Sequence, residues 1–147
     1  MAKEVKLTLE EAKKQLEKTY GKGSVITGKE ISTDYDVIDT GSIGLNHVLN
    51  IGGIPSKGKL IEIIGWESSG KSTLVQHIVA NAQKKYKAEG SKKKVLYVDG
   101  ENSIDRTYAT AIGIDLDDLL IVQLDSSGGE GAYNKADILV KTGEIGL

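Results

Sequence analysis

"KLIEIIGWESSGKST", residues 59–73, determines the fold class that we expect for this chain. An aliphatic run of strand length, residues 59–65, precedes a glycine-rich turn, and helix-forming residues follow the turn. Residues 65–72 match the spacing G-x-x-x-x-G-K-[ST], which joins a strand to the N-terminus of a helix. We therefore predict a short buried strand over 59–65, then a loop, then a helix from Ser69.

The glycine-rich turn has the composition of a phosphate-binding loop. Gly65 and Gly70 permit backbone turns that aim successive N–H groups inward, and these groups bind phosphate oxygens together with the helix N-terminus. Lys71 adds a cation between the β- and γ-phosphates, and the Ser72 hydroxyl can reach Mg²⁺. The pattern predicts a nucleotide site, and a glycine-rich structural turn is the alternative.

Strands alternate with helices on the C-terminal side of this loop. The predicted strands are residues 93–101 and 118–124. The predicted helices are one that begins at Ser69 and has Tyr86 on its apolar face, and two more over residues 105–114 and 132–143. Residues 144–147 have the character of the start of another strand. This alternation predicts an α/β fold, with a parallel sheet and flanking helices.

An amphipathic helix is expected near the N-terminus. Thr8 and Glu11 fit a capping box, and Gly21 ends the helical pattern. The apolar positions Leu9, Ala12, Leu16 and Tyr20 recur at helical spacing. This narrow stripe either packs on its own domain or docks on a neighbouring molecule.

Two carboxylates follow the strand predicted at residues 93–101. Asp99 and Glu101 stand at its C-terminal end, the edge at which open α/β sheets bind ligands. Their i, i+2 spacing predicts that both point to one face. Glu101 is the candidate for polarising a water for attack on a phosphate. The alternative is that both carboxylates cap the next turn.

Composition narrows the possible classes of protein. The chain has 147 residues, is 39% hydrophobic and 27% charged, and has a formal net charge of −2. It contains no cysteine, which excludes disulfides and thiolate metal sites. No apolar run is long enough to cross a membrane, so a cytoplasmic protein is expected. Six lysines in residues 84–94 form either a solvated helix end or a nucleic-acid patch.

Several segments together resemble a known family. "KKQLEKTYGKGSV", "DTGSIGLNHVL", "GGIPSKGKLIEIIGWESSGKSTL", "LYVDGENSIDRTYATAIGID" and "LLIVQLDSSGGEGA" occur in this order. From about residue 13 onward they are similar to the N-terminal part of a bacterial or phage RecA-type DNA recombinase. Trp66 departs from the family, which usually has proline at this position of the loop.

The resemblance implies a P-loop NTPase fold of RecA type that binds ATP and Mg²⁺. It also implies an ATP-dependent filament on single-stranded DNA. Glu101 and Lys71 would be catalytic, and Ser72 would bind Mg²⁺. The implied nucleotide contacts are Gly65, Trp66, Glu67, Ser68, Ser69, Gly70, Lys71, Ser72, Thr73, Asp105 and Tyr108. Of these, Asp105 and Tyr108 would contact the adenine.

The same resemblance implies a division of the chain. Residues 1–33 would be a helix and linker that dock on a neighbouring protomer, by self-association or on a full-length recombinase. Residues 34–147 would be the ATPase core, incomplete because the second Mg²⁺-associated aspartate and the DNA-binding loops would lie beyond Leu147. We therefore expect a recombinase fragment that alone hydrolyses ATP weakly or not at all.

Two other functions remain open at this point. The chain could be a non-catalytic nucleotide-binding protein that caps or modulates a full-length recombinase through its first helix. It could also be a related P-loop ATPase of replicative-helicase type. The segments "ESSGK" and "DGENSID" disfavour the helicase-like alternative.

Overall fold

The computed structural model describes residues 7–31 and 35–147, and the chain divides into two compact units, residues 1–34 and 35–147. The first unit contains α1 (Leu9–Tyr20) and the short 3₁₀ helix η1 (Gly28–Glu30). As predicted, Thr8 caps α1. Its backbone N–H donates to the Glu11 carboxylate at 2.9 Å, and Gly21 ends the helix with φ 98°. No residue of α1 is buried.

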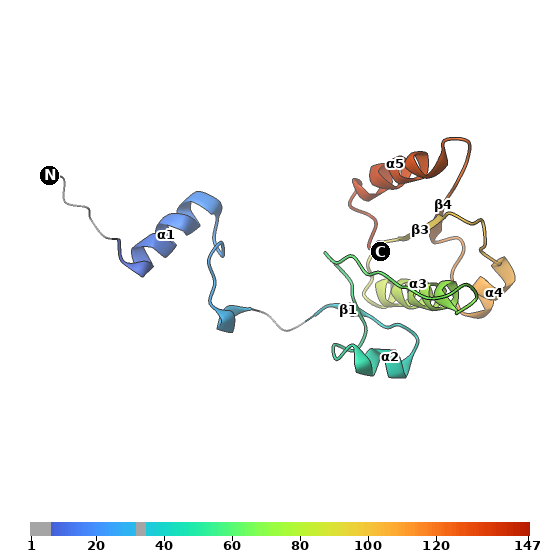
Figure 1. Ribbon diagram of the computed structural model, residues 1–147, viewed down its shortest axis with the longest axis horizontal. Helices are drawn as coiled ribbons and strands as arrows, with labels where there is room; N and C mark the ends of the chain where they lie inside the picture. Colours follow the sequence, from blue (N-terminus) through green and yellow to red (C-terminus); the bar gives the residue numbers. More distant parts are fainter. Residues whose placement is uncertain (1–6, 32–34) are drawn as a thin grey trace. The chain divides into compact units, whose positions relative to one another are not determined.

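The second unit carries the remaining secondary structure (Figure 1). Its elements are β1 (Val37–Ile38), α2 (Ile43–Val48), β2 (Ile54–Pro55), α3 (Lys71–Ala88), β3 (Val95–Asp99), α4 (Arg106–Ala111), β4 (Leu119–Gln123) and α5 (Gly128–Val140). The predicted strands at 93–101 and 118–124 and the helices after the loop are present, with shifted ends. The last helix begins earlier than expected, at Gly128.

A small parallel sheet lies at the centre of this unit. β3 and β4 pair in parallel from Val95 opposite Leu119 to Asp99 opposite Gln123. A parallel bridge joins Lys94 to Ile145, so residues 144–147 approach β3 from its other side. β3 and β4 lie between α3 and α5 (Figure 1). The expected α/β class, with helices and a small parallel sheet, is confirmed.

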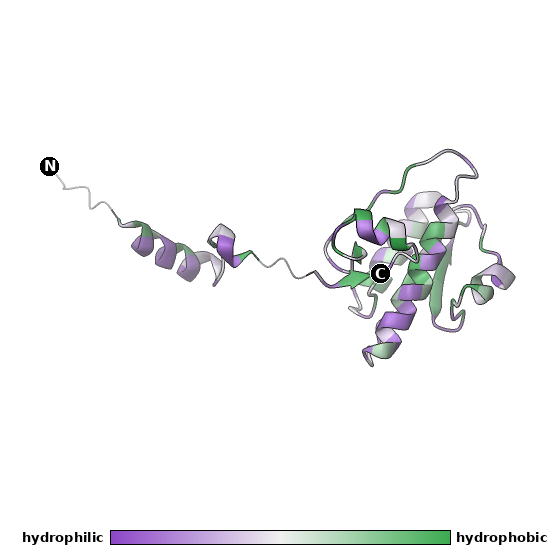
Figure 2. Ribbon diagram, turned by 90° about the horizontal axis from the view of Figure 1, so that it is seen from below, coloured by the Kyte–Doolittle hydropathy of each residue, from purple (hydrophilic) through white to green (hydrophobic). Residues whose placement is uncertain are grey.

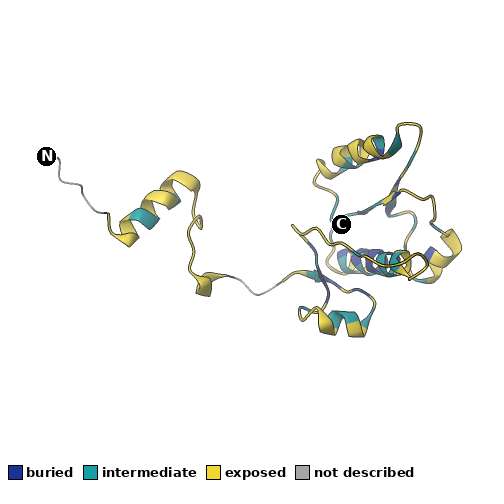
Figure 3. Cartoon of the chain, in the orientation of Figure 1, coloured by how far each residue is buried: buried dark blue, intermediate teal, exposed yellow. Residues whose placement is uncertain are grey.

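The core forms where α3 packs under the sheet. Ile78, Val79 and Ala82 on α3 are at most 5% exposed, and Val95 on β3 is 1% exposed. Figure 3 shows this buried side of α3 beneath the strands, and Figure 2 shows its hydrophobic residues against the polar remainder of the helix. Aliphatic residues at helical spacing thus bury one face of α3, as the sequence predicted.

The prediction of a buried strand at residues 59–65 is wrong. These residues adopt no regular secondary structure, and Leu60 and Ile64 are 100% and 83% exposed. An extended segment becomes a strand only when a neighbour satisfies its backbone groups. Along the described part of the chain, β3 pairs with β4 and residues 144–147, and nothing pairs with 59–65.

A second difference is the short antiparallel pair of β1 and β2, which the sequence did not predict. Ile38 pairs with Ile54, and both are buried against α3. Each strand has two residues, too few for an alternating pattern to be recognised. Among the described residues, no helix combines the length and apolar character needed to cross a lipid bilayer.

Candidate functional site

The glycine-rich loop leads directly into α3. Gly70 is the N-cap of this helix and has φ 89°, a left-handed conformation that favours glycine. Gly65 is closely packed, since a Cβ at that position would lie 2.6 Å from the Ser69 hydroxyl. The two glycines therefore allow the tight path that the sequence pattern implied, although the segment before them is not a strand.

The Lys71 side chain folds back over the loop. Its ammonium donates hydrogen bonds to the backbone carbonyls of Gly65, at 2.9 Å, and of Trp66, at 2.8 Å. These bonds hold the cation over the loop rather than out in solvent. Phosphate oxygens brought to this position would compete with the two neutral carbonyls for the charged donor.

Glu101 and the loop line the same pocket. This pocket has a volume of about 510 Å³ and is lined by Glu67, Ser68, Ser69, Gly70, Lys71, Ser72, Thr73 and Glu101. Glu101 lies two residues beyond the end of β3, while the loop precedes α3. The fold thus brings a carboxylate and the predicted phosphate-binding residues together from segments about thirty residues apart.

Asp99 has a different environment from Glu101. It is 3% exposed, and its carboxylate accepts hydrogen bonds from the backbone N–H groups of Glu101, Ser103 and Ile104 at 3.2 to 3.3 Å. Asp99 does not line the pocket of Lys71 and Glu101. The expectation that both carboxylates share one face is wrong, because the strand ends at Asp99 and the chain turns before Glu101.

Asp105 and Tyr108 lie together at the start of α4. Asp105 is the N-cap of this helix, and its carboxylate accepts a hydrogen bond of 3.0 Å from the backbone N–H of Tyr108. The Tyr108 side chain is 39% exposed. Neither residue lines the pocket that contains Lys71 and Glu101. Their predicted contact with adenine stays a prediction.

The pocket has groups suited to a nucleotide with a magnesium ion. α3 is an 18-residue helix whose first N–H groups have no intrahelical acceptors and lie beside the loop. Lys71 and the Ser72 hydroxyl stand in its first turn. No group of three or more potential metal-binding side chains occurs in residues 7–31 and 35–147. A magnesium ion held by Ser72 and phosphate oxygens would require no such group.

Trp66, one of the expected nucleotide contacts, has a side-chain orientation that the sequence pattern could not predict. It is 90% exposed at the edge of the loop, and its backbone carbonyl binds both Lys71 and the N–H of Ser69. Its departure from the usual proline was the available signal, but the direction of the ring depends on the loop's path.

Some lysines of residues 84–94, the C-terminal end of α3 and the loop after it, form ion pairs. Lys85 pairs with Asp36 and with Glu89, and Lys94 pairs with Asp118. Two of the six lysines in residues 84–94 thus have acidic partners within the fold. This favours the solvated helix end over the nucleic-acid patch.

Comparison with protein families matches residues 7–147 to the family described as the RecA N-terminal domain. Proteins named Protein RecA are among the relatives. That of Paramagnetospirillum magneticum is 45% identical over 139 residues, 93% of this chain and 36% of the relative. That of Rickettsia massiliae is 46% identical over 134 residues, which are 90% of this chain and 36% of the relative.

A third relative, Protein RecA of Bifidobacterium longum, is 43% identical over 141 residues, which are 95% of this chain and 33% of the relative. The chain therefore spans about a third of the length of the curated relatives that it matches.

Proposed function

The chain belongs to the RecA N-terminal domain family, and we propose that it is the ATP-binding part of a RecA-type DNA recombinase. The relatives carry the name RecA, which supports a role in homologous recombination and DNA repair. We further propose that the chain has a P-loop NTPase fold of RecA type, assembles on single-stranded DNA and is located in the cytoplasm.

The observation that carries the proposal is the shared pocket of Glu101 and the phosphate-binding loop. In the proposed complex, loop N–H groups and Lys71 hold the β- and γ-phosphates, and Ser72 holds Mg²⁺. The bound ion would neutralise charge on the phosphates. Glu101 would accept a proton from the attacking water or orient it, because it lines the same pocket as Lys71.

The adenine contacts form the outer part of the proposed site. The second carboxylate oxygen of Asp105 is available to the exocyclic amine, since the first caps α4. The exposed Tyr108 ring would stack on the base. Trp66 and the other loop residues, Glu67 to Thr73, complete the contacts.

Calorimetric titration with ATP and Mg²⁺ tests this function. The chain should bind ATP, and Lys71→Ala should weaken binding about tenfold or more, because a charged hydrogen-bond donor to phosphate is lost. Lys141→Ala is the control, since Lys141 pairs with Asp137 on the surface of α5. Equal ATP affinity of the Lys71 variant and the unaltered chain would refute the proposed site.

A second function is favoured by the surface of α1. Leu9, Leu16 and Tyr20 are 88%, 40% and 74% exposed, and no residue of this helix is buried. A narrow apolar stripe without a covering partner among residues 7–31 is suited to docking on another protomer. The chain would then self-associate, or cap or modulate the filament of a full-length recombinase, without hydrolysing ATP itself.

This second function is tested by mixing the chain with an intact bacterial RecA recombinase. Substoichiometric chain should lower DNA-stimulated ATP hydrolysis, and Leu9→Lys should abolish the effect by placing a charge on the stripe. Lys14→Glu, a change on the polar side of α1, should leave the effect intact. No inhibition by the unaltered chain would exclude a capping role.

A further inference from the structure

Another pocket, of about 280 Å³, lies at the C-terminal ends of β3 and β4 and shares no lining residue with the pocket of Lys71 and Glu101. We call it the Arg106 pocket. Four polar and three aliphatic residues line it: Asp99, Asn102, Arg106 and Gln123, and Ile104, Leu116 and Ile121. Open α/β sheets bind ligands at this edge of their parallel strands.

Arg106 has a guanidinium group without an ionic partner. It is the only arginine of the chain and the first residue of α4. Within residues 7–31 and 35–147 it forms no ion pair, not even with Asp99, which lines the same pocket. A guanidinium presents five N–H donors in one plane and can hold a carboxylate through two of them. Arg106 is therefore available to a ligand that carries a carboxylate.

The Asp99 carboxylate retains one position for a hydrogen-bond donor. Its Oδ1 accepts the N–H groups of Glu101, at 3.3 Å, and Ser103, at 3.2 Å, whereas its Oδ2 accepts only that of Ile104, at 3.3 Å. Each carboxylate oxygen has two lone pairs, so Oδ2 can accept one more bond. Because Asp99 is 3% exposed, a cationic donor at Oδ2 would be held mostly out of water, where such a bond is strong.

The rest of the pocket supplies amides and an aliphatic wall. Both Asn102 and Gln123 have an amide group that can donate and accept hydrogen bonds. Ile104 and Leu116 pack against the core, and Ile121 is 41% exposed. No aromatic side chain is among the described residues that line the pocket, so the wall suits a branched aliphatic group better than a flat ring that would stack.

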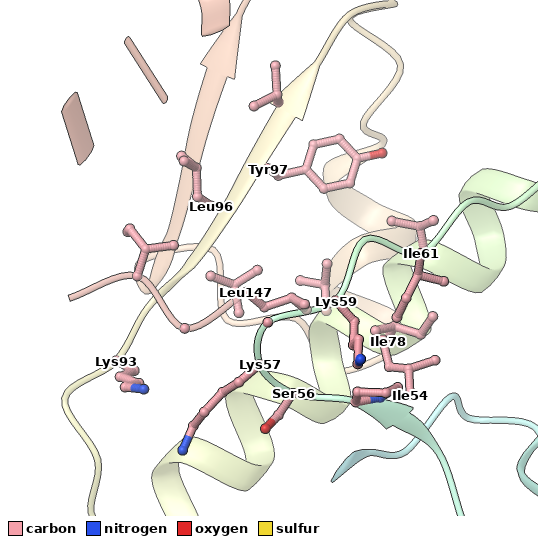
Figure 4. Close-up of a pocket in the computed structure, with 18 of the residues that line it drawn as sticks. Ile54, Ser56, Lys57, Lys59, Ile61, Ile78, Lys93, Leu96, Tyr97 and Leu147 are labelled. Carbon is pink, nitrogen blue, oxygen red and sulfur yellow. The ribbon is translucent and has the colours of Figure 1, made fainter. Parts of the chain in front are cut away.

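The larger apolar groove of about 690 Å³, shown in Figure 4, lacks this combination of charges. Leu96 and Tyr97 lie on one side of it in the figure, and Ile54 and Ile61 lie on the other. The described residues that line this groove include three lysines and no carboxylate or amide side chain. It therefore has no group to hold a cation, whereas the Arg106 pocket can hold a cation and an anion together.

We propose that the Arg106 pocket binds a free α-amino acid with a branched aliphatic side chain, such as leucine. Arg106 holds the carboxylate of this ligand, Asp99 Oδ2 accepts a hydrogen bond from its ammonium, and the aliphatic wall packs against its side chain. One cation and one anion in the pocket match a ligand that has one charge of each sign. A ligand with a single charge would leave one of the two groups unmatched. The volume is suited to a small ligand of this kind.

The Arg106 pocket also shares a turn with the proposed ATP site. Glu101 lines the pocket of the phosphate-binding loop, and the next residue, Asn102, lines the Arg106 pocket. Asn102 has φ 50°, a left-handed conformation that turns the chain between the two pockets. A bound amino acid would hold this turn and thereby limit the movement of Glu101. The value of this effect for catalysis rests on the proposed function, whereas binding of the amino acid does not.

Calorimetric titration of the full 147-residue chain with L-leucine, up to about 10 mM, tests the pocket. Leucine should bind saturably. Three compounds that each lack one feature of leucine should bind at least about tenfold more weakly. These are 4-methylpentanoate, without the ammonium, leucinol, without the carboxylate, and glycine, without the aliphatic side chain.

Matched variants locate the binding. Arg106→Gln should weaken leucine binding about tenfold or more, because the charged two-point donor is lost. Lys141→Gln removes a cation of α5 that does not line the pocket and should leave the affinity unchanged. Asn102→Gly removes one amide but keeps a residue that adopts positive φ, and it should weaken binding about threefold or more.

Hydrogen exchange tests the effect on the turn. At a leucine concentration about ten times its Kd, exchange of the N–H groups of Glu101, Ser103 and Ile104 should slow about tenfold. Lys71→Ala, which removes a proposed ATP contact, should bind leucine as tightly as the unaltered chain. Failure of the ATP site would therefore leave leucine binding intact, and the two proposals are tested separately.

The outcomes that would overturn the site are specific. They are no binding of leucine up to about 10 mM, equal affinity for leucine and any of the three reduced compounds, or unchanged affinity in the Arg106 variant. Leucine binding with unchanged exchange in residues 101–104 would retain the site and overturn its link to Glu101.

Discussion

The Lys71 ammonium donates a hydrogen bond of 2.8 Å to the backbone carbonyl of Trp66, the only tryptophan of the chain. The side chain of Trp66 is 90% exposed beside the loop. A change in what Lys71 binds therefore releases a backbone group of the residue that carries the one indole group in the protein.

Trp66 should report the arrival of a nucleotide. Phosphate oxygens would take Lys71 from the two carbonyls, so Trp66 emission should change in a saturable manner as ATP and Mg²⁺ are added. Lys71→Ala should lose this response, while Lys141→Ala should keep it. The same saturable response in the Lys71 variant would show that the signal has another origin.

Glu101→Gln should separate binding from turnover. A carboxylate facing the phosphates repels them, so its neutralisation should tighten ATP binding about threefold, as expected for like charges across a hydrated pocket. Loss of the proton acceptor should lower residual hydrolysis about 100-fold.

Calorimetry and a phosphate-release assay measure these two effects for Glu101→Gln. Glu130→Gln, on α5 and away from the pocket, is the control and should change neither. Unchanged hydrolysis in the Glu101 variant would remove this residue from the proposed mechanism.

Asp99→Asn should destabilise the fold rather than alter chemistry. The buried carboxylate accepts three backbone N–H groups, and an amide in its place aims a donor at one of them. The free energy of unfolding should fall by about 1–3 kcal/mol. Urea unfolding measures this loss, and Asp117→Asn at an exposed position should cost less than about 0.5 kcal/mol. A loss no larger than that control would contradict the role of Asp99 in the turn.

Asp36 should contribute to stability against acid. Its carboxylate accepts hydrogen bonds from Lys85 and from the Ser56 hydroxyl, and Lys57 lies 3.6 Å away. Hydrogen bonding to Lys85, then to Ser56, lowers the pKa of Asp36 from 3.8 to about 2. A lowered pKa in the folded state stabilises the protein above about pH 4, and this contribution is lost as the pH falls toward 2.

Asp36→Asn should therefore reduce stability at pH 7 and flatten its decline between pH 4 and 2. The effect should stay below about 1 kcal/mol, because the Asp36 side chain is 46% exposed and its charge is screened. Thermal melts across this pH range measure it. Asp137→Asn, which breaks an exposed pair with Lys141, should change stability by less than about 0.5 kcal/mol. An equally steep acid decline in the Asp36 variant would refute the assignment.

Much of the local structure could be predicted because its causes are local. The Thr8 capping box and the face of α3 that includes Val79 depend on residues a few positions apart. The positions of the two strands of the parallel sheet could be predicted from their aliphatic runs, although their pairing joins residues far apart in sequence. The different environments of Asp99 and Glu101 could not be predicted from their positions in the sequence. Their environments depend on where β3 ends and the backbone turns, and the i, i+2 rule holds only within the strand.

The sequence by itself determined the α/β class, the order of strands and helices, and the glycine-rich loop before α3, since hydrophobic period and glycine placement act over short distances. Only the tertiary structure decided that Glu101 lines one pocket with the loop and that residues 59–65 form no strand pair. Those outcomes depend on which segments meet in space. A strand, unlike a helix, takes its hydrogen bonds from a neighbour elsewhere in sequence.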